Sequence, residues 1–196
     1  MALVERSELL KLGDYEGIRE PFRARVIAEK KARRVHLGDK ISAVFENHDT
    51  VLLQIQEMLR TERITKEPAI AHEIETYNQL VPRKDELSLT AMIEIDERAT
   101  REKFLVDARG IEKSFALVVT VDGKEETCKA TWDAARAEPD RASAVLYLKL
   151  PLTKATAEGI RNHKATAILT VEHDAYAAKI EIPKAALASL AEDLSE

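Results

Sequence analysis

The sequence has very little cysteine. Cys128 is the single cysteine among 196 residues. A disulfide needs two cysteines, and structural zinc sites and iron–sulfur clusters are usually held by several thiolates. A disulfide framework and a cysteine-ligated cluster are therefore excluded, and we expect Cys128 to behave as a small buried apolar side chain.

Long apolar runs are also missing. The longest, Phe115–Val119, is far shorter than the roughly 20 residues of a transmembrane helix. The first residues, MALVERSELLKLGD, lack the apolar core of a secretory signal. The net charge is -5, which argues against a protein that binds nucleic acid or an anionic membrane. We therefore expect a cytoplasmic protein without a membrane partner.

Motifs that carry known chemistry are absent as well. The chain contains no Gly-x-Gly-x-x-Gly, no P-loop and no Gly-x-Ser-x-Gly. No two of the five histidines have the spacing of metal ligands: His36, His48, His72, His163 and His173. Because these motifs are absent, we assign no catalytic residue and leave the cofactor unknown. Their absence favours a protein that is not an enzyme.

The apolar residues of the chain recur with two periods, one typical of helices and the other of strands. Before Pro82 this periodicity predicts a short helix over 5–12, a helix over 21–35, a strand over 40–46 and a helical hairpin over 50–61 and 68–81. After Pro82, strands at 86–95, 114–121, 124–132, 144–150, 164–172 and 176–182 alternate with helices at 96–109, 153–162 and 184–194. Asp122-Gly123 is a strong hairpin signal.

This order of elements predicts an α+β fold. N-terminal helices with the helical hairpin would pack on a mainly antiparallel sheet that carries further helices. We divide the chain into a mostly helical part, 1–82, and an antiparallel α+β part, 83–196, and expect one compact unit.

The predicted helix over 21–35 is strongly basic. Between Gly17 and Lys40 the chain has eight lysines and arginines against three acidic residues. Lys30, Lys31, Arg33 and Arg34 could contact an acidic partner or an anion. The alternative is a solvated face whose cations favour the C-terminal end of the helix dipole. Nucleic acid is the least favoured partner of this surface.

The helical hairpin carries polar residues that are flanked by apolar ones. Gln54 and Glu57 belong to a polar stripe of the first helix that leucine and methionine flank on both sides. Glu73 falls inside the apolar arc of the second helix, so both glutamates are predicted to lie at least partly inward. A buried carboxylate needs a cation, hydrogen-bond donors, a shared proton or a metal.

The nearest partners by residue type are Arg19, Arg23, Arg60, Gln54 and Tyr77. These groups could form a packed polar network that fixes how the helices meet. They could instead line a ligand pocket, or a metal site in which Glu57 and Glu73 are ligands. A ferritin-like di-iron site is not expected, because it requires Glu-x-x-His pairs and the chain has none.

Four segments together resemble a known family: DYEGIREPFRARVIAEKKARRVHLG, FENHDTVLLQIQEMLRTERI, EIETYNQLVP and ELSLTAMIEI. They are similar to the bacterial family called domain of unknown function 3501, whose activity is not established. Members resemble one another most over Phe45–Arg60 and Glu73–Asn78, and they are often encoded beside a rubrerythrin and an iron–sulfur oxidoreductase subunit. The resemblance therefore implies service in electron transfer or peroxide defence.

Two hypotheses about function follow. The first is a cytoplasmic accessory protein that docks on an iron–sulfur or rubrerythrin-like partner through the basic helix and the hairpin. The second is a module, enzymatic or not, that binds a small ligand or metal at the hairpin carboxylates. Self-association is compatible with both.

Overall fold

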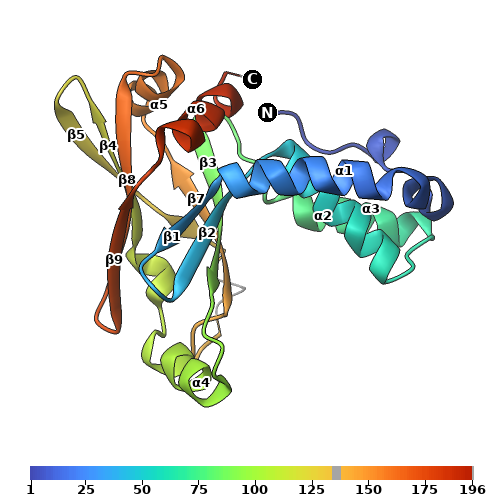
Figure 1. The fold of residues 1–196 in the computed structure, drawn as a ribbon, viewed down its shortest axis with the longest axis horizontal. Helices are drawn as coiled ribbons and strands as arrows, with labels where there is room; N and C mark the ends of the chain where they lie inside the picture. Colours follow the sequence, from blue (N-terminus) through green and yellow to red (C-terminus); the bar gives the residue numbers. More distant parts are fainter. Residues whose placement is uncertain (134–137, 196) are drawn as a thin grey trace.

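Two antiparallel sheets form the centre of the molecule (Figure 1). The computed structural model describes residues 1–133 and 138–195. In spatial order, sheet A contains β1 (Arg34–Leu37), β2 (Ile41–Glu46), β3 (Glu86–Ile93), β7 (Val145–Pro151) and β6 (Thr131–Trp132). Sheet B contains β5 (Lys124–Lys129), β4 (Phe115–Val121), β8 (Ala165–His173) and β9 (Tyr176–Glu181). The predicted α+β class is confirmed.

Helices lie around this pair of sheets. They are η1 (Arg6–Glu8), α1 (Leu12–Ala32), α2 (His48–Thr61), α3 (Glu67–Asn78), α4 (Arg98–Asp107), η2 (Ile111–Ser114), α5 (Lys154–Arg161) and α6 (Lys184–Asp193). We call η1 and α1–α3 together the helical arm, which extends from one side of sheet A in Figure 1. None of the described helices is both long and apolar enough to cross a bilayer.

The main core lies between the inner faces of the two sheets. Phe45, Leu89 and Leu148 enter it from sheet A, and Leu117 and Leu169 enter it from sheet B. Alternation along each strand places these apolar residues on one face. Burial of each such side chain stabilises the fold by about 1.5–3 kcal/mol.

The outer face of sheet A is also largely covered, which its sequence does not suggest. All six positions of β2 are buried, although every second residue must point away from the main core. The arm has its own apolar core, which includes Val51, Ile55 and Leu59 of α2 and reaches Tyr147 of β7. The space between the arm and this outer face is therefore partly shielded from solvent.

The pairing of β2 with β3 crosses the boundary that we drew at residue 82. Val44 lies opposite Thr90, and Thr90 lies opposite Tyr147. Strands from both sides of the boundary thus build one sheet. The arm, not the whole segment 1–82, is the separate structural layer.

Three predicted boundaries near the N-terminus are wrong. The expected helix over 5–12 is only the turn η1, and α1 begins at Leu12 and continues through Pro21. A proline inside a helix costs about 3 kcal/mol, but Tyr15 and Arg19 bond to α2 and hold the first half of α1 in place. The helix ends at Ala32 because Arg34–Leu37 pair with β2 as β1.

Gly17 offers a test of how α1 is stabilised. It lies on the exposed side of the helix, and a Cβ added there would meet nothing within 4 Å. Because glycine is a weak helix former, Gly17→Ala should stabilise the protein by about 0.5–1 kcal/mol. Urea unfolding measures the change. Gly159→Ala in α5 is the contrasting variant, since its Cβ would overlap Val121 and should destabilise the fold. A destabilised Gly17→Ala protein would contradict the assignment of α1 as one helix.

Candidate functional site

Glu57 of α2 faces α1 and accepts three hydrogen bonds from it. Its Oε1 accepts hydrogen bonds from Tyr15 Oη at 2.7 Å and Arg19 Nε at 2.8 Å. Arg19 Nη2 donates to Oε2 at 2.9 Å, and Arg23 Nε lies 3.9 Å from the same oxygen. Two parallel bonds from one guanidinium form the bidentate geometry that binds a carboxylate most strongly.

These contacts shift both partners in the expected directions. Hydrogen bonding to Arg19 lowers the pKa of Glu57, and the Tyr15 bond acts in the same direction. Burial raises the pKa of Tyr15, and the bond to Glu57 raises it further, so the phenol remains a neutral donor. Both Glu57 oxygens already accept strong bonds from protein groups. The arrangement fits a packed polar network that joins α1 to α2, and it leaves little capacity for a metal.

The structure does not bring all the predicted hairpin residues together. Arg60 Nε donates to Glu16 at 2.6 Å and does not join the Glu57 contacts. Glu73 is half-buried on α3, and within the described chain its carboxylate has no hydrogen bond or ion pair. Residues 1–133 and 138–195 contain no group of three or more histidine, cysteine or acidic side chains that could hold a metal.

The Glu57 network predicts a pH-dependent contribution to stability. A lowered carboxylate pKa stabilises the fold above the usual value of 4.5, and this contribution is lost as the pH falls through the lower folded-state value. Glu57→Gln should therefore lower the free energy of unfolding by about 1–3 kcal/mol at neutral pH. The difference from the wild type should vanish in acid, as urea unfolding across pH can measure. Glu75→Gln, at an exposed position of α3, is the matched control. A difference that does not change with pH would contradict the ionic network.

The four basic residues that we expected on one partner surface lie in different environments. Lys31 is exposed, whereas Lys30 and Arg34 are half-buried. Arg33 is 0% exposed, so its assignment to a partner surface is wrong. Its guanidinium faces inward because it donates to the carbonyl oxygens of Phe45 and Glu46, to Ser189 and to Asp193. Arg33 therefore fastens the end of α1 to β2 and α6.

Lys30 and Arg34 border a cavity between the arm and the outer face of sheet A. We call it the arm cavity, and its volume is about 210 Å³. The wall formed by sheet A contains a row of residues that lie opposite one another on neighbouring strands, namely Val44, Thr90 and Tyr147. The facing helices contribute these residues: Lys30 from α1, Thr50, Val51 and Gln54 from α2, and Tyr77 from α3. Gln54 and Tyr77, expected near Glu57, thus border this cavity.

Two polar side chains of the arm cavity, Thr90 and Glu46, make no hydrogen bond with the described residues. Thr90 is 9% exposed, and its Oγ1 has no hydrogen-bond partner in the described structure. The Glu46 side chain is 7% exposed, and its nearest cation is Lys30 Nζ at 3.8 Å, beyond hydrogen-bond distance. An unbonded buried polar group destabilises a fold by about 1–3 kcal/mol. The arm cavity thus contains binding groups that the rest of the described chain does not satisfy.

A second cavity of about 510 Å³ continues along the same face and shares Leu80 and Tyr147 with the first. Its charged residue from β7 is Lys149, whose Nζ donates to Val81 O at 3.0 Å and lies 3.2 Å from Glu86 Oε1. Burial lowers the pKa of Lys149 despite the opposing effect of Glu86. This amine already has protein partners, in contrast to the Thr90 hydroxyl of the arm cavity.

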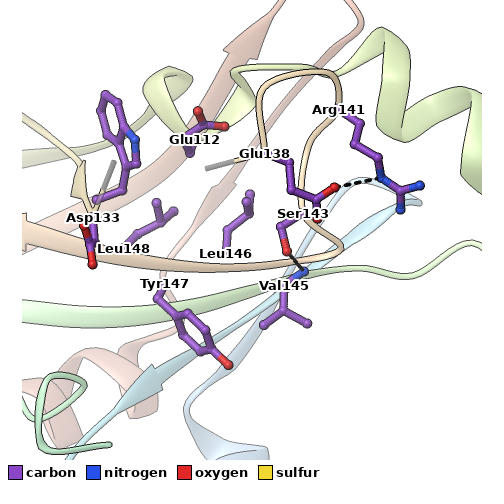
Figure 2. A pocket seen from close by; sticks show the side chains of 10 residues that line it. Glu112, Asp133, Glu138, Arg141, Ser143, Val145, Leu146, Tyr147 and Leu148 are labelled. Carbon is purple, nitrogen blue, oxygen red and sulfur yellow. Dashed lines mark hydrogen bonds and ion pairs between the residues drawn. The ribbon is translucent and has the colours of Figure 1, made fainter. Parts of the chain in front are cut away.

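Figure 2 shows a third, smaller pocket beside β7, with a volume of about 40 Å³. Leu146 and Leu148 lie on one side of the strand, and Tyr147 points to the other. This alternation directs Tyr147 toward the arm, while its two neighbours belong to the main core. The small pocket shares Val145 and Tyr147 with the arm cavity, but no residue of the arm lines it.

Sequence patterns missed three residues that matter here. Tyr15 stands before Pro21, where we expected no continuous helix. Glu46 and Thr90 occupy alternate positions of strands whose other face is apolar, which is typical of residues that face solvent. The signal that marks them is burial under the arm, and this depends on how distant segments pack.

The fold and site define an α+β protein with two antiparallel sheets and a helical arm that forms a cavity with one of them. The model of the family "Protein of unknown function (DUF3501)" matches residues 3–194. The chain therefore belongs to this family, as the resemblance indicated. Its fold is similar to the crystal structure of a novel protein of unknown function from Burkholderia pseudomallei K96243, with a TM-score of 0.88 and 32% identity. The match covers 98% of this chain and 100% of the other. No curated protein matches the chain.

Proposed function

We propose that the protein binds a small polar ligand in the arm cavity. The observation that carries this proposal is the unpartnered hydroxyl of Thr90, which is buried and borders the cavity. A hydroxyl in this state lowers stability, and a partner supplied by a ligand would offset that loss. The cavity volume of about 210 Å³ suits a molecule smaller than the drug-sized ligands that fill typical pockets.

The position of the cavity also fits a binding role. Its two walls come from separate layers, so a ligand between them would contact both the arm and sheet A. Ligand binding stabilises the state that binds, which here requires the arm to rest on the sheet. The proposal moves the ligand site from the Glu57 carboxylate, which is saturated, to the space beside Gln54 and Tyr77.

Thr90→Val tests this proposal, because valine has nearly the same shape without the hydroxyl. The variant should be more stable than the wild type by about 1 kcal/mol in ligand-free buffer. It should also lose most of the thermal stabilisation that the wild type gains from a panel of amino acids, organic acids, sugars and nucleotides. Thr127→Val, at an exposed position of β5, should behave as the wild type does. If no compound stabilises the wild type, the proposal fails.

A second candidate function is docking on a redox partner. The outward surface of α1 favours it, because this helix of 21 residues buries only Tyr15 and Val26. Ile27 is 43% exposed, and the exposed Lys31 lies one helical turn later on the same face. Apolar side chains beside cations are typical of surfaces that contact an acidic partner. A rubrerythrin-like or iron–sulfur protein is the partner that the family resemblance implies.

Titration with purified candidate partners tests the docking function. Lys31→Glu should weaken binding by about tenfold, and added salt should weaken the wild-type complex. Lys154→Glu, on the distant helix α5, is the matched control because its side chain is 86% exposed. Equal binding by both variants, or binding that salt does not change, would contradict electrostatic docking through α1.

A further inference from the structure

Two opposite charges form a loose ion pair in the arm cavity, without a direct hydrogen bond between them. Lys30 Nζ, from α1, lies 3.8 Å from Glu46 Oε2, at the end of β2. The side chains are 25% and 7% exposed, so both charges have lost much of their contact with bulk water. Neither group makes a hydrogen bond with any described residue. Buried ions are normally both paired and directly hydrogen-bonded, whereas this pair lacks the direct hydrogen bond.

A ligand that carries two different charges would satisfy both groups most strongly, because a hydrogen bond between two charged groups is stronger than one to a neutral group. An anion alone would bond to Lys30 but would lie against the Glu46 carboxylate. A cation alone would bond to Glu46 but would lie against the Lys30 ammonium. Like charges at such short range repel strongly where water is scarce. Both single-charge classes are therefore poor matches for this part of the cavity.

The short distance between the two groups limits the ligand further. Bond lengths of about 1.5 Å place the nitrogen and the nearest carboxylate oxygen of an α-amino acid roughly 3 Å apart. This spacing matches two protein charges that are 3.8 Å apart. The Thr90 hydroxyl can accept from an ammonium group or donate to a carboxylate. The apolar wall contains Val51, Leu80, Met92 and Val145, which suit an uncharged side chain.

We propose that the ligand of the arm cavity is a free α-amino acid with an uncharged, apolar side chain. Lys30 binds its carboxylate, Glu46 binds its ammonium group, and Thr90 bonds to one of the two. This inference rests on the proposed function, because it assigns a chemical class to the ligand of the same cavity. It adds a specificity that the volume and polarity of the cavity alone do not give.

Calorimetric titration of the wild-type protein with the standard L-amino acids tests the inference. At least one neutral amino acid should bind. Its amine analogue without the carboxylate, and its acid analogue without the amine, should each bind at least about tenfold more weakly. This comparison uses only the wild-type protein, so it does not depend on whether a variant folds.

Variants assign the two ends of the ligand. Glu46→Gln and Lys30→Met should each weaken the binding of this amino acid by about tenfold or more. The acid analogue should lose less affinity relative to the amino acid in Glu46→Gln than in the wild type, because the repelling carboxylate is gone. The amine analogue should likewise lose less affinity in Lys30→Met. Lys31→Met, at the exposed neighbouring position, should leave binding unchanged.

Two negative results have different meanings. If a sugar, nucleotide or singly charged compound binds in the cavity and no amino acid does, the amino-acid inference fails while the proposed binding function stands. If no compound binds, both fail. Amino-acid binding that neither Glu46→Gln nor Lys30→Met weakens would also overturn the inference.

Discussion

Arg33→Met should destabilise the protein by about 3–5 kcal/mol, because it removes a buried ion pair with the carboxylate of Asp193. Arg33 is 0% exposed, and the Asp193 side chain is 8% exposed. The same guanidinium donates to Phe45 O at 2.9 Å and to Ser189 Oγ at 2.7 Å, so the substitution also removes bonds to β2 and α6. The melting temperature should fall by on the order of 10 °C.

Two further variants separate the lost charge pair from general damage. Arg33→Met combined with Asp193→Leu should be more stable than Arg33→Met alone, because the buried carboxylate that loses the Arg33 cation is then removed as well. Lys31→Met, two residues earlier and exposed, should change stability by less than about 0.5 kcal/mol. Chemical unfolding of all three proteins gives the comparison. An Arg33→Met protein as stable as Lys31→Met would contradict the assigned role of Arg33.

Gly38→Ala should have the second-largest effect, a loss of about 2–4 kcal/mol that combines backbone strain with a steric overlap. Gly38 has a φ of +65°, and a Cβ there would overlap the Tyr176 hydroxyl. That hydroxyl donates to Leu37 O at 2.5 Å and accepts from Lys40 N at 3.2 Å. Because Tyr176 belongs to β9, these bonds join the β1–β2 turn of sheet A to sheet B.

Gly110→Ala is the matched control for strain alone. Gly110 has a φ of +83°, and an added Cβ would meet nothing within 4 Å. We expect it to lose only about 1–2 kcal/mol. Tyr176→Phe in the Gly38→Ala background should be less harmful than in the wild type, since it removes the overlapping oxygen. Urea unfolding of the wild type, Gly38→Ala, Tyr176→Phe and the double variant measures this coupling. Equal losses for Gly38→Ala and Gly110→Ala would exclude the proposed contact with Tyr176.

Much of the fold follows from local sequence. Alternation in KISAVFE and ELSLTAMIEI predicts β2 and β3, and Asp122-Gly123 predicts the turn between β4 and β5. The first helix is harder, because Pro21 favours a helix start. The continuous α1 depends on bonds from Tyr15 and Arg19 to Glu57, residues that are 42 and 38 positions away. Such long-range contacts are not visible in a local pattern.

The candidate site follows less directly from the sequence than the fold does. A helical wheel predicts that Glu57 lies at least partly inward and needs partners, and the structure supplies Arg19, Arg23 and Tyr15. For strands, the alternation of apolar and polar residues predicts that Glu46 and Thr90 point outward from half-buried strands. They are buried because the arm covers the second face of sheet A. Only the packing of two separate layers creates the arm cavity.

Methionine-methyl NMR during ligand titration tests the central claim most directly. The protein has three methionines, and of these only Met92 borders the arm cavity. In wild-type protein labelled at the methionine methyl groups, a neutral L-amino acid should shift the Met92 signal and leave those of Met1 and Met58 largely unchanged. Thr90→Val should weaken this response. A Met92 signal that no amino acid, organic acid, sugar or nucleotide changes would contradict a ligand site between the arm and sheet A.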